Sequence, residues 1–169
     1  MERGEYCLAP LSAEHGPDVI RLFNHYVEAD FSAYFDRPMP EAFFGRLLEM
    51  TRDYPAFAAL DASGAVVGFA FLHAYHPAPT LARTAEVTYF LAPEHVGRGL
   101  GHRLLEALID GGRKRGCDNF VASISSQNAG SLAFHTRMGF IECGRIARAG
   151  TKFGQEFDVV YMQRRLPQE

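Results

Sequence analysis

The sequence has few of the features that mark secreted, membrane-spanning or nucleic-acid-binding proteins. Its three cysteines, Cys7, Cys117 and Cys143, are odd in number and widely spaced. This pattern argues against a disulfide framework and suits a reducing compartment. No apolar run approaches the roughly 18 residues of a membrane-spanning helix, and the first residues lack the basic start and apolar centre of a signal peptide. We therefore expect a cytoplasmic protein with no membrane partner.

Neither sign of charge dominates the composition. Lys and Arg number 17 and Asp and Glu number 20, which gives a formal net charge of −3. A slightly acidic surface gives no reason to expect a nucleic-acid partner. The 169 residues are 47% hydrophobic and 22% charged, which is ordinary for one globular domain. We predict that residues 1–169 form a single domain.

Hydrophobic periodicity predicts an α+β fold. Residues 75–82 contain Pro77 and Pro79 and are expected to form a loop. Because several predicted strands follow one another directly, the order favours α+β over a regular doubly wound sheet. Strands are expected at 5–11, 55–60, 65–74, 83–91, 119–125, 140–148 and 157–165, the last two antiparallel. Helices are expected at 18–27, from Pro40 through Leu48, at 99–113 and at 128–138.

The most informative stretch is the glycine-rich segment 89–105, YFLAPEHVGRGLGHRLL. A predicted strand runs into a turn with glycine at alternate positions, Gly97, Gly99 and Gly101, and a strong helix begins at once. The first N–H groups of a helix are unpaired and lie at its positive end, and glycine lets a ligand approach them closely. The combination predicts a pyrophosphate-binding loop. The alternative is that the glycines serve only a tight turn between strand and helix.

Two common nucleotide-binding motifs do not match this spacing. The dinucleotide motif G-x-G-x-x-G needs a further glycine where the sequence has His102 or Leu104. A Walker loop needs G-x-x-x-x-G-K-S/T, which does not occur in the sequence. The phosphate ligand is therefore expected to belong to another class.

The glycine segment resembles a motif of the GNAT superfamily of N-acetyltransferases. Residues 96–101, VGRGLG, resemble its Q/R-x-x-G-x-G/A motif, with Val96 where Gln or Arg is usual. Residues 128–140, NAGSLAFHTRMGF, resemble its N-x-x-S-x-x-L-Y-x-x-x-G-F segment, with His135 in place of Tyr. Within the superfamily, residues 24–28, NHYVE, and 84–86, TAE, resemble the phosphinothricin acetyltransferase-like group. This likeness extends over nearly the whole chain.

The resemblance implies both a fold and a co-substrate. The implied fold is a GNAT-like mixed, mostly antiparallel sheet of about seven strands with helices on both faces. Acetyl-CoA would bind where two central parallel strands splay apart, and a homodimer is implied as well. A strand backbone N–H would contact the thioester oxygen. The implied cofactor-binding residues are Tyr89, Phe90, Leu91, Val96, Gly97, Arg98, Gly99, Leu100, Gly101, His102, Asn128 and Ser131, with Arg103 as a further basic candidate.

Two residues are candidates for the chemistry of acetyl transfer, in which the acceptor amine must lose a proton. Glu86 is the candidate general base, directly or through a water; the alternative is an outward-facing strand glutamate. His135 could protonate the leaving thiolate or hold a water near it, or it could be a histidine with satisfied hydrogen bonds on a helix flank. Asn128 is expected to cap the short helix that follows it and also to contact the cofactor.

The acceptor site is expected around the aromatic segment after the first helix. Glu28, Phe31, Tyr34 and Tyr75 are the candidate substrate-binding residues, and hydrophobic packing beneath a loop is the alternative for the aromatic ones. The phosphinothricin acetyltransferase-like group usually has an Arg and a Tyr in the loop 75–82, where this sequence has Ala78 and Leu81. We therefore expect phosphinothricin to be a poor acceptor.

We expect an acetyl-CoA-dependent N-acetyltransferase that acts on the primary amine of a small molecule, an amino acid or an analogue. A non-catalytic acyl-CoA-binding or sensing module would need the glycine loop but not Glu86. A protein N-acetyltransferase would use Glu86 but would need an open groove for a peptide. No metal site is expected, because His73 and His76 have no third ligand nearby in the sequence.

Overall fold

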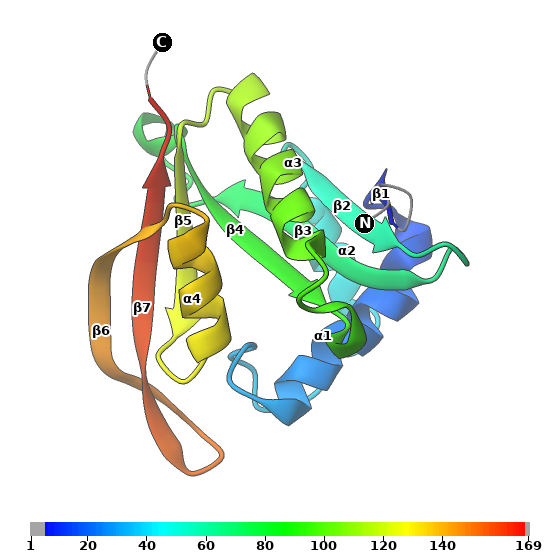
Figure 1. Cartoon of the computed structure of the whole chain (residues 1–169), viewed down its shortest axis with the longest axis horizontal. Coiled ribbons are helices and arrows are strands. Elements are labelled where there is room, and N and C mark those ends of the chain that lie inside the picture. Colours follow the sequence, from blue (N-terminus) through cyan, green and yellow to red (C-terminus); the bar gives the residue numbers. More distant parts are fainter. Residues whose placement is uncertain (1–5, 168–169) are drawn as a thin grey trace.

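The computed structural model describes residues 6–167, and its centre is a seven-stranded sheet in the order β1-β2-β3-β4-β5-β7-β6. The strands are β1 (Cys7–Pro10), β2 (Ala56–Leu60), β3 (Val66–Ala74), β4 (Thr84–Leu91), β5 (Asn119–Ser125), β6 (Ile141–Lys152) and β7 (Gln155–Arg165). The helices are α1 (Gly16–Ala29), α2 (Phe43–Met50), α3 (Leu100–Lys114) and α4 (Ala129–Arg137). Helices α3 and α4 lie on one side of the sheet, and α1 and α2 lie on the other (Figure 1).

Alternation along the strands gives the sheet two apolar faces. On β3, Phe69 and Phe71 pack with α1 and α2, whereas Ala70 and Leu72 pack with α3. Successive strand residues point to opposite faces, so a nearly continuous apolar run is buried on both sides. The sheet therefore separates two cores, and each strand can place side chains of different chemistry on opposite sides.

The long helix α3 is held by a stripe of leucines at helical spacing. Leu100, Leu104, Leu105 and Leu108 are fully buried, and Gly112 continues the stripe against the side chains of the sheet. Because the first turn of the helix carries Leu100, burial of this residue fixes the N-terminal end of α3 close to the end of β4.

Pairing between the parallel strands β4 and β5 covers only one end of each strand. The register runs from Thr84–Asn119 to Glu86–Val121 and stops there. On its other edge, β4 remains paired with β3 from Ala85 to Leu91. Beyond Glu86, the edge of β4 that faces β5 therefore has no strand partner among the described residues. The predicted splay of two central parallel strands is confirmed.

The predicted α+β class and mixed sheet are confirmed, with differences at element ends. The helix expected from Pro40 begins at Phe43. Residues 40–42 form a turn instead, because the N–H groups of Phe43, Phe44 and Gly45 donate to the carbonyls three residues earlier, of Pro40, Glu41 and Ala42, and not four residues earlier as in an α-helix. Glu5, the predicted start of the first strand, lies outside the described residues. The strand predicted to end at Arg148 continues to Lys152, with shifts in its register with β7.

We predict opposite effects of alanine at two helical glycines. A Cβ at Gly112 would lie 2.8 Å from the Phe120 ring and 2.9 Å from Leu72, whereas a Cβ at Gly45 in α2 would meet nothing within 4 Å. Gly112→Ala should lower the free energy of unfolding by about 1–3 kcal/mol through overpacking. Gly45→Ala should raise it by about 0.5–1 kcal/mol. Urea denaturation measures both, and equal effects of the two substitutions would contradict this packing.

Candidate active site

The glycine segment between β4 and α3 has the geometry of an anion-binding loop. Gly97 and Gly99 have φ angles of +80° and +82°, in the left-handed region that favours glycine. A Cβ built on either would meet nothing within 4 Å, so the space beside the loop is open. Gly99 is the N-cap of α3, and the first N–H groups of that helix have no acceptor within it. These groups can bind an anionic ligand such as a pyrophosphate.

The other predicted cofactor-binding residues flank this loop. Tyr89, Phe90 and Leu91 form the end of β4, and the Tyr26 hydroxyl of α1 donates to the Leu91 carbonyl at 2.6 Å. Val96, Arg98 and His102 are exposed around the glycines, and Leu100 is buried beneath them. Arg103 donates to the Tyr6 carbonyl at 3.1 Å.

A hydrogen bond between Tyr89 and His135 joins the end of β4 to α4. The Nδ1 atom of His135 lies 2.8 Å from the Ser131 carbonyl oxygen, which can only accept, so Nδ1 carries the proton. The Nε2 atom of the neutral ring can then only accept, and the Tyr89 hydroxyl donates to it. The two rings stack with centroids 5.5 Å apart.

Burial keeps the His135 ring neutral. The residue is only 3% exposed, and burial lowers its pKa to about 4. Burial also raises the pKa of Tyr89. Both partners are therefore uncharged at neutral pH, and both nitrogen atoms of the ring are hydrogen-bonded. Such a ring is not an imidazolium that could donate a proton.

Asn128 connects α4 to the segment that follows α1. Its Oδ1 atom accepts from the Ser131 N–H at 3.1 Å, which confirms the predicted N-cap. Its Nδ2 atom donates to the Ser32 hydroxyl at 3.0 Å. One side chain therefore fixes both the start of α4 and the position of the 30–36 segment.

Glu86 lies on the opposite face of the sheet from Tyr89. Tyr89 packs with the α3 core, whereas Phe90, which shares the face of Glu86, packs with the α1 core. The Glu86 side chain is 25% exposed, and its Oε2 atom lies 3.9 Å from Nε2 of His73, its cross-strand partner. Burial raises the pKa of the Glu86 carboxyl, and His73 lowers it. Glu86 is therefore half-buried beside an imidazole, unlike the outward-facing glutamate of the alternative interpretation.

Polar groups continue from Glu86 along this face. The Asn119 side chain donates to the Thr84 hydroxyl at 2.9 Å and accepts from Gln163 at 2.8 Å. Neither Asn119 nor Gln163 belongs to a motif in the sequence, and the spacing of His73 and His76 suggested only a metal ligand. The signal for His73 was available, because the expected hairpin of 65–74 and 83–91 brings His73 near Glu86.

The predicted acceptor residues are only partly brought together. The Tyr34 hydroxyl lies 3.2 Å from the Ser123 hydroxyl of β5, and burial and, to a lesser degree, the charge of Glu86 raise the pKa of Tyr34. Phe31 and Tyr34 both contact Phe157 of β7. Glu28 is exposed on the last turn of α1, and Tyr75 is 48% exposed just beyond β3. Within residues 6–167, neither forms a hydrogen bond or an ion pair with Glu86.

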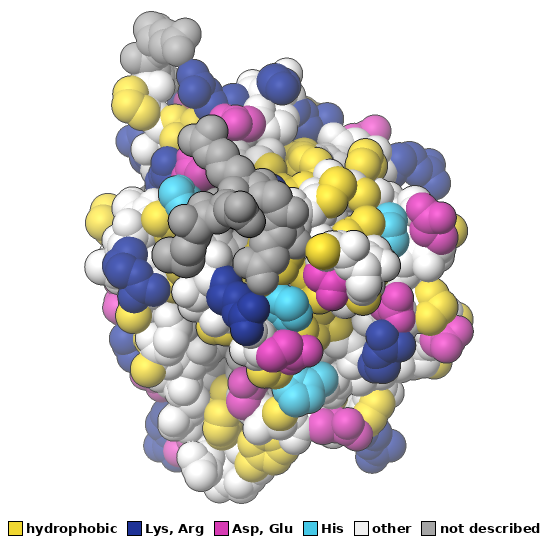
Figure 2. Space-filling model, turned by 45° about the vertical axis from the view of Figure 1, so that its right-hand side comes forward, with side chains coloured by type: hydrophobic (Ala, Val, Ile, Leu, Met, Phe, Trp, Pro, Cys, Tyr) yellow, Lys and Arg dark blue, Asp and Glu magenta, His cyan; other side chains and the backbone are white. Residues whose placement is uncertain are grey.

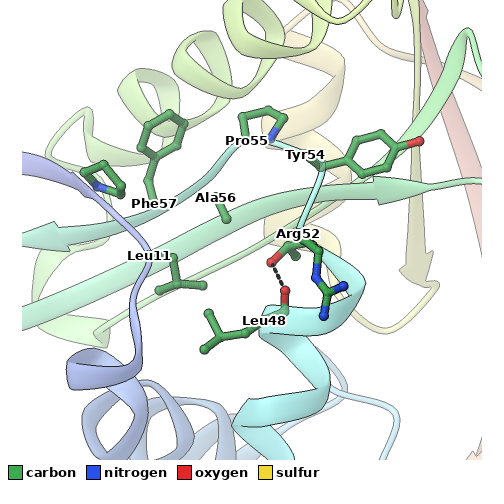
Figure 3. Close-up of a pocket in the computed structure, with 9 residues that line it drawn as sticks. Leu11, Leu48, Arg52, Tyr54, Pro55, Ala56 and Phe57 are labelled. Carbon is green, nitrogen blue, oxygen red and sulfur yellow. Dashed lines mark hydrogen bonds between the residues drawn. The ribbon is translucent and has the colours of Figure 1, made fainter.

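A hollow of about 330 Å³ lies away from these residues, between the end of α2 and the start of β2 (Figure 3). Leu11, Leu48 and Phe57 contribute apolar surface to it, and Arg52 lies at its edge. None of its lining residues belongs to β4, β5 or the glycine loop. We therefore assign the candidate site from the side chains around the β4–β5 splay and not from this hollow.

Charge on the surface is mixed, and Figure 2 shows acidic, basic and histidine side chains interspersed on the face that it presents. Within residues 6–167, no group of three or more His, Cys, Asp or Glu side chains could hold a metal ion. None of the helices in that range is long and apolar enough to cross a membrane.

Comparisons with known proteins agree with this geometry. Residues 19–140 match the model of the acetyltransferase (GNAT) family. An L-methionine sulfoximine/L-methionine sulfone acetyltransferase of Pseudomonas aeruginosa is 32% identical over 151 residues, 87% of each chain. A phosphinothricin N-acetyltransferase of Streptomyces coelicolor is 33% identical over 149 residues, 86% of this chain and 87% of that one. The structure of a GNAT superfamily phosphinothricin acetyltransferase from Sinorhizobium meliloti in complex with acetyl-CoA has a TM-score of 0.90 and 29% identity, covering 96% of this chain and 89% of that chain.

The buried His135 predicts a loss of stability in mild acid. The unfolded chain binds a proton at this ring below about pH 6.5, but the folded chain binds it only below about pH 4. The free energy of unfolding should therefore fall as the pH falls through this interval, by on the order of 1–2 kcal/mol between pH 7 and pH 5.

Urea denaturation of wild type and His135→Gln at both pH values measures this contribution. The variant should lose less stability between pH 7 and pH 5 than the wild type. His25→Gln, which replaces an exposed histidine of α1, is the matched control and should keep the pH dependence of the wild type. An identical pH dependence in His135→Gln would contradict the buried neutral ring.

Proposed function

The chain belongs to the acetyltransferase (GNAT) family, and we propose that it transfers the acetyl group of acetyl-CoA to the primary amine of an amino acid or amino-acid analogue. The observation that carries this proposal is the position of Glu86. It is the half-buried carboxylate at the last residue pair before β4 and β5 separate. Amino-acid analogues are the substrates named for the relatives from Pseudomonas and Streptomyces.

The residues of the glycine loop fit the pyrophosphate of acetyl-CoA. Gly97 and Gly99 leave open space beside the loop, and the first turn of α3 offers N–H donors at the positive end of the helix. The end of β4 beyond Glu86 offers backbone groups to the rest of the cofactor. When bound, acetyl-CoA would supply the acetyl group: a C–N bond would form at the thioester carbon as the C–S bond breaks. Coenzyme A would leave as the thiol, which takes one of the two protons that the ammonium nitrogen loses. A backbone N–H of β4 would stabilise the oxygen that becomes negative.

Glu86 is proposed as the group that takes the proton of the amine. An ammonium has no lone pair with which to attack, so it must first lose a proton. Burial raises the pKa of Glu86 and makes it a stronger base than an exposed carboxylate. A protonated His73 opposes this shift and favours the ionised form that can accept the proton. The transfer runs directly or through one water.

We assign His135 a positioning role. Its neutral ring accepts a hydrogen bond from the Tyr89 hydroxyl and so holds that hydroxyl between β4 and α4. The proton of this hydrogen bond therefore stays on the Tyr89 hydroxyl and is not transferred to His135. Asn128 and Ser131 act at the start of α4, where Asn128 caps the helix.

The acceptor is proposed to have a neutral side chain. Ala78 and Leu81 in the loop before β4 provide no cation or hydroxyl for a second acidic group. Arg83 is held by the Asp118 carboxylate through two hydrogen bonds, and Lys152 donates to backbone carbonyls. An acidic side chain would lose a partner worth about 1–3 kcal/mol. Phosphinothricin is therefore expected to be a poorer acceptor than methionine sulfone or methionine sulfoximine.

One N-acetyltransferase domain is supported by the single sheet, which contains strands from Cys7 to Arg165. A homodimer is supported by the outer strand β6, where Ile141 is 68% exposed. A cytoplasmic location is supported by the three cysteines, all of which are free thiols.

The activity is tested by turnover with a panel of amines, measured as thiol released from acetyl-CoA. The role of Glu86 as the base is tested with the variant Glu86→Gln. Glutamine keeps the shape of the side chain but cannot take a proton. We expect the rate with the best amine to fall by at least ~100-fold at neutral pH while acetyl-CoA affinity is unchanged. Part of the loss should be recovered at high pH, where more of the amine is already deprotonated.

A variant within threefold of wild type at neutral pH would remove Glu86 from the mechanism. Acetyl-CoA binding without turnover, over an amine panel that includes methionine sulfone, would instead favour a non-catalytic acyl-CoA-binding module. Acetylation of peptides in preference to free amino acids would favour a protein acetyltransferase.

The cofactor loop is tested at Gly99, where asparagine is the informative replacement. Asparagine tolerates left-handed angles better than most other non-glycine residues, so Gly99→Asn adds a side chain with little backbone strain. Valine at φ +82° would be strained as well as bulky. Gly99→Asn should weaken acetyl-CoA binding by about tenfold or more in calorimetry, with the thermal midpoint nearly unchanged. Wild-type affinity in this variant would place the pyrophosphate elsewhere.

A further inference from the structure

Lys152, the last residue of β6, is a buried lysine that has no role in the proposed chemistry. It is 6% exposed. Its Nζ atom donates to the Asp30 carbonyl at 2.6 Å and to the Ala33 carbonyl at 2.7 Å. A buried ammonium is costly unless it is hydrogen-bonded and faces negative charge. Asp30 and Asp36 supply that charge, and they oppose the effect of burial, which lowers the pKa of Lys152.

Both hydrogen-bond acceptors of Lys152 belong to the 30–36 segment, which also carries two of the predicted acceptor residues. The Phe31 ring contacts Phe153 and Phe157 edge-on, at centroid distances of 5.5 and 5.8 Å. The Tyr34 ring stacks on Phe157 at 5.7 Å, and its hydroxyl reaches Ser123. The end of the β6–β7 hairpin therefore holds this segment by polar and aromatic contacts at once.

The turn of the β6–β7 hairpin places Phe153 against the 30–36 segment, and its backbone angles are unfavourable for a bulky residue. Phe153 and Gly154, between β6 and β7, have φ angles of +52° and +71°. Two-residue turns with both angles positive favour Asn-Gly, and a bulky residue at such an angle is strained. Phe153 nevertheless occupies the first position, 55% exposed, with its ring against Phe31. The contact of the Phe153 ring with Phe31 offsets part of the cost of this strained backbone angle.

We propose that Lys152, assisted by Phe153, is a positioning residue that holds Phe31 and Tyr34 as one wall of the amine-acceptor site. This inference rests on the proposed acetyltransferase function. The connection to the reaction runs through Tyr34, whose hydroxyl lies 3.2 Å from that of Ser123, two residues beyond Val121, the β5 residue paired with Glu86. The glycine loop is held separately by the burial of Leu100. Loss of the Lys152 contacts should therefore impair binding of the amine and leave acetyl-CoA binding intact.

Steady-state kinetics of Lys152→Met and Phe153→Asn test the proposal with two different changes. Lys152→Met keeps an unbranched side chain but leaves both carbonyls unpaired, so KM for the amine should rise by about tenfold or more. KM for acetyl-CoA should stay within about twofold of wild type. Phe153→Asn relieves the turn strain, so its thermal midpoint should not fall. Its KM for the amine should still rise, by about threefold.

Hydrogen exchange provides a readout that does not depend on activity. Amides of the 30–36 segment should exchange about tenfold faster in Lys152→Met than in wild type, while those of α3 should be unchanged. Lys114→Met is the matched control. Lys114 is exposed at the end of α3 and is the other of the two lysines in the chain. That variant should match wild type in both measurements.

The outcomes separate this inference from the proposed function. An amine KM within twofold of wild type in both variants overturns the inference, and so does an equal rise in KM for both substrates. If the wild type acetylates no amine, the proposed function fails, and hydrogen exchange alone decides whether Lys152 holds the segment. If the amides of the 30–36 segment exchange equally fast in Lys152→Met and wild type, the inference is overturned whether or not the enzyme is active. Any change in KM would then have another cause.

Discussion

The parallel pairing of β4 and β5 spans three residue pairs, from Thr84–Asn119 to Glu86–Val121, and then ends. Unpaired backbone groups are costly when they are buried, so a sheet with such an opening needs other partners for them. The structure provides one within the chain, because the Tyr26 hydroxyl donates to the Leu91 carbonyl. The remaining strand edge is suited to an extended ligand. Both helices that follow these strands begin near this opening, and the site depends on that arrangement.

Because strand residues alternate between the faces of the sheet, side chains on both faces lie beside this opening. Tyr89 lies with α3 and α4, where the glycine loop begins. Glu86 lies on the other face with His73, near the segment that carries Tyr34. A cofactor held from one side and an amine held from the other would meet at the splay. In the proposed mechanism, the sheet would thus keep Glu86 on the amine side and apart from the glycine loop.

Much of the fold could be predicted from the sequence, because the apolar periodicity of the helices and strands is strong. The stripe from Leu100 to Ile109 and the alternation of Phe120, Ala122 and Ile124 are examples. Residues whose role depends on long-range contacts were harder to predict. His73 faces Glu86 only through strand register, and Lys152 reaches carbonyls about 120 positions away along the chain, at Asp30 and Ala33. The protonation state of His135 could not be predicted either, since it follows from burial.

The scarcity of lysine has a practical consequence for handling the protein. Of the two lysines, Lys152 is enclosed by the 30–36 segment, whereas Lys114 is exposed on the last turn of α3. A helix of 15 residues is about 22 Å long, so Lys114 lies far from the glycine loop at the opposite end. Amine-reactive dyes or resin linkers would therefore attach at Lys114 among the lysines. The enzyme could be labelled or immobilised there with both substrate-binding faces left open to solution.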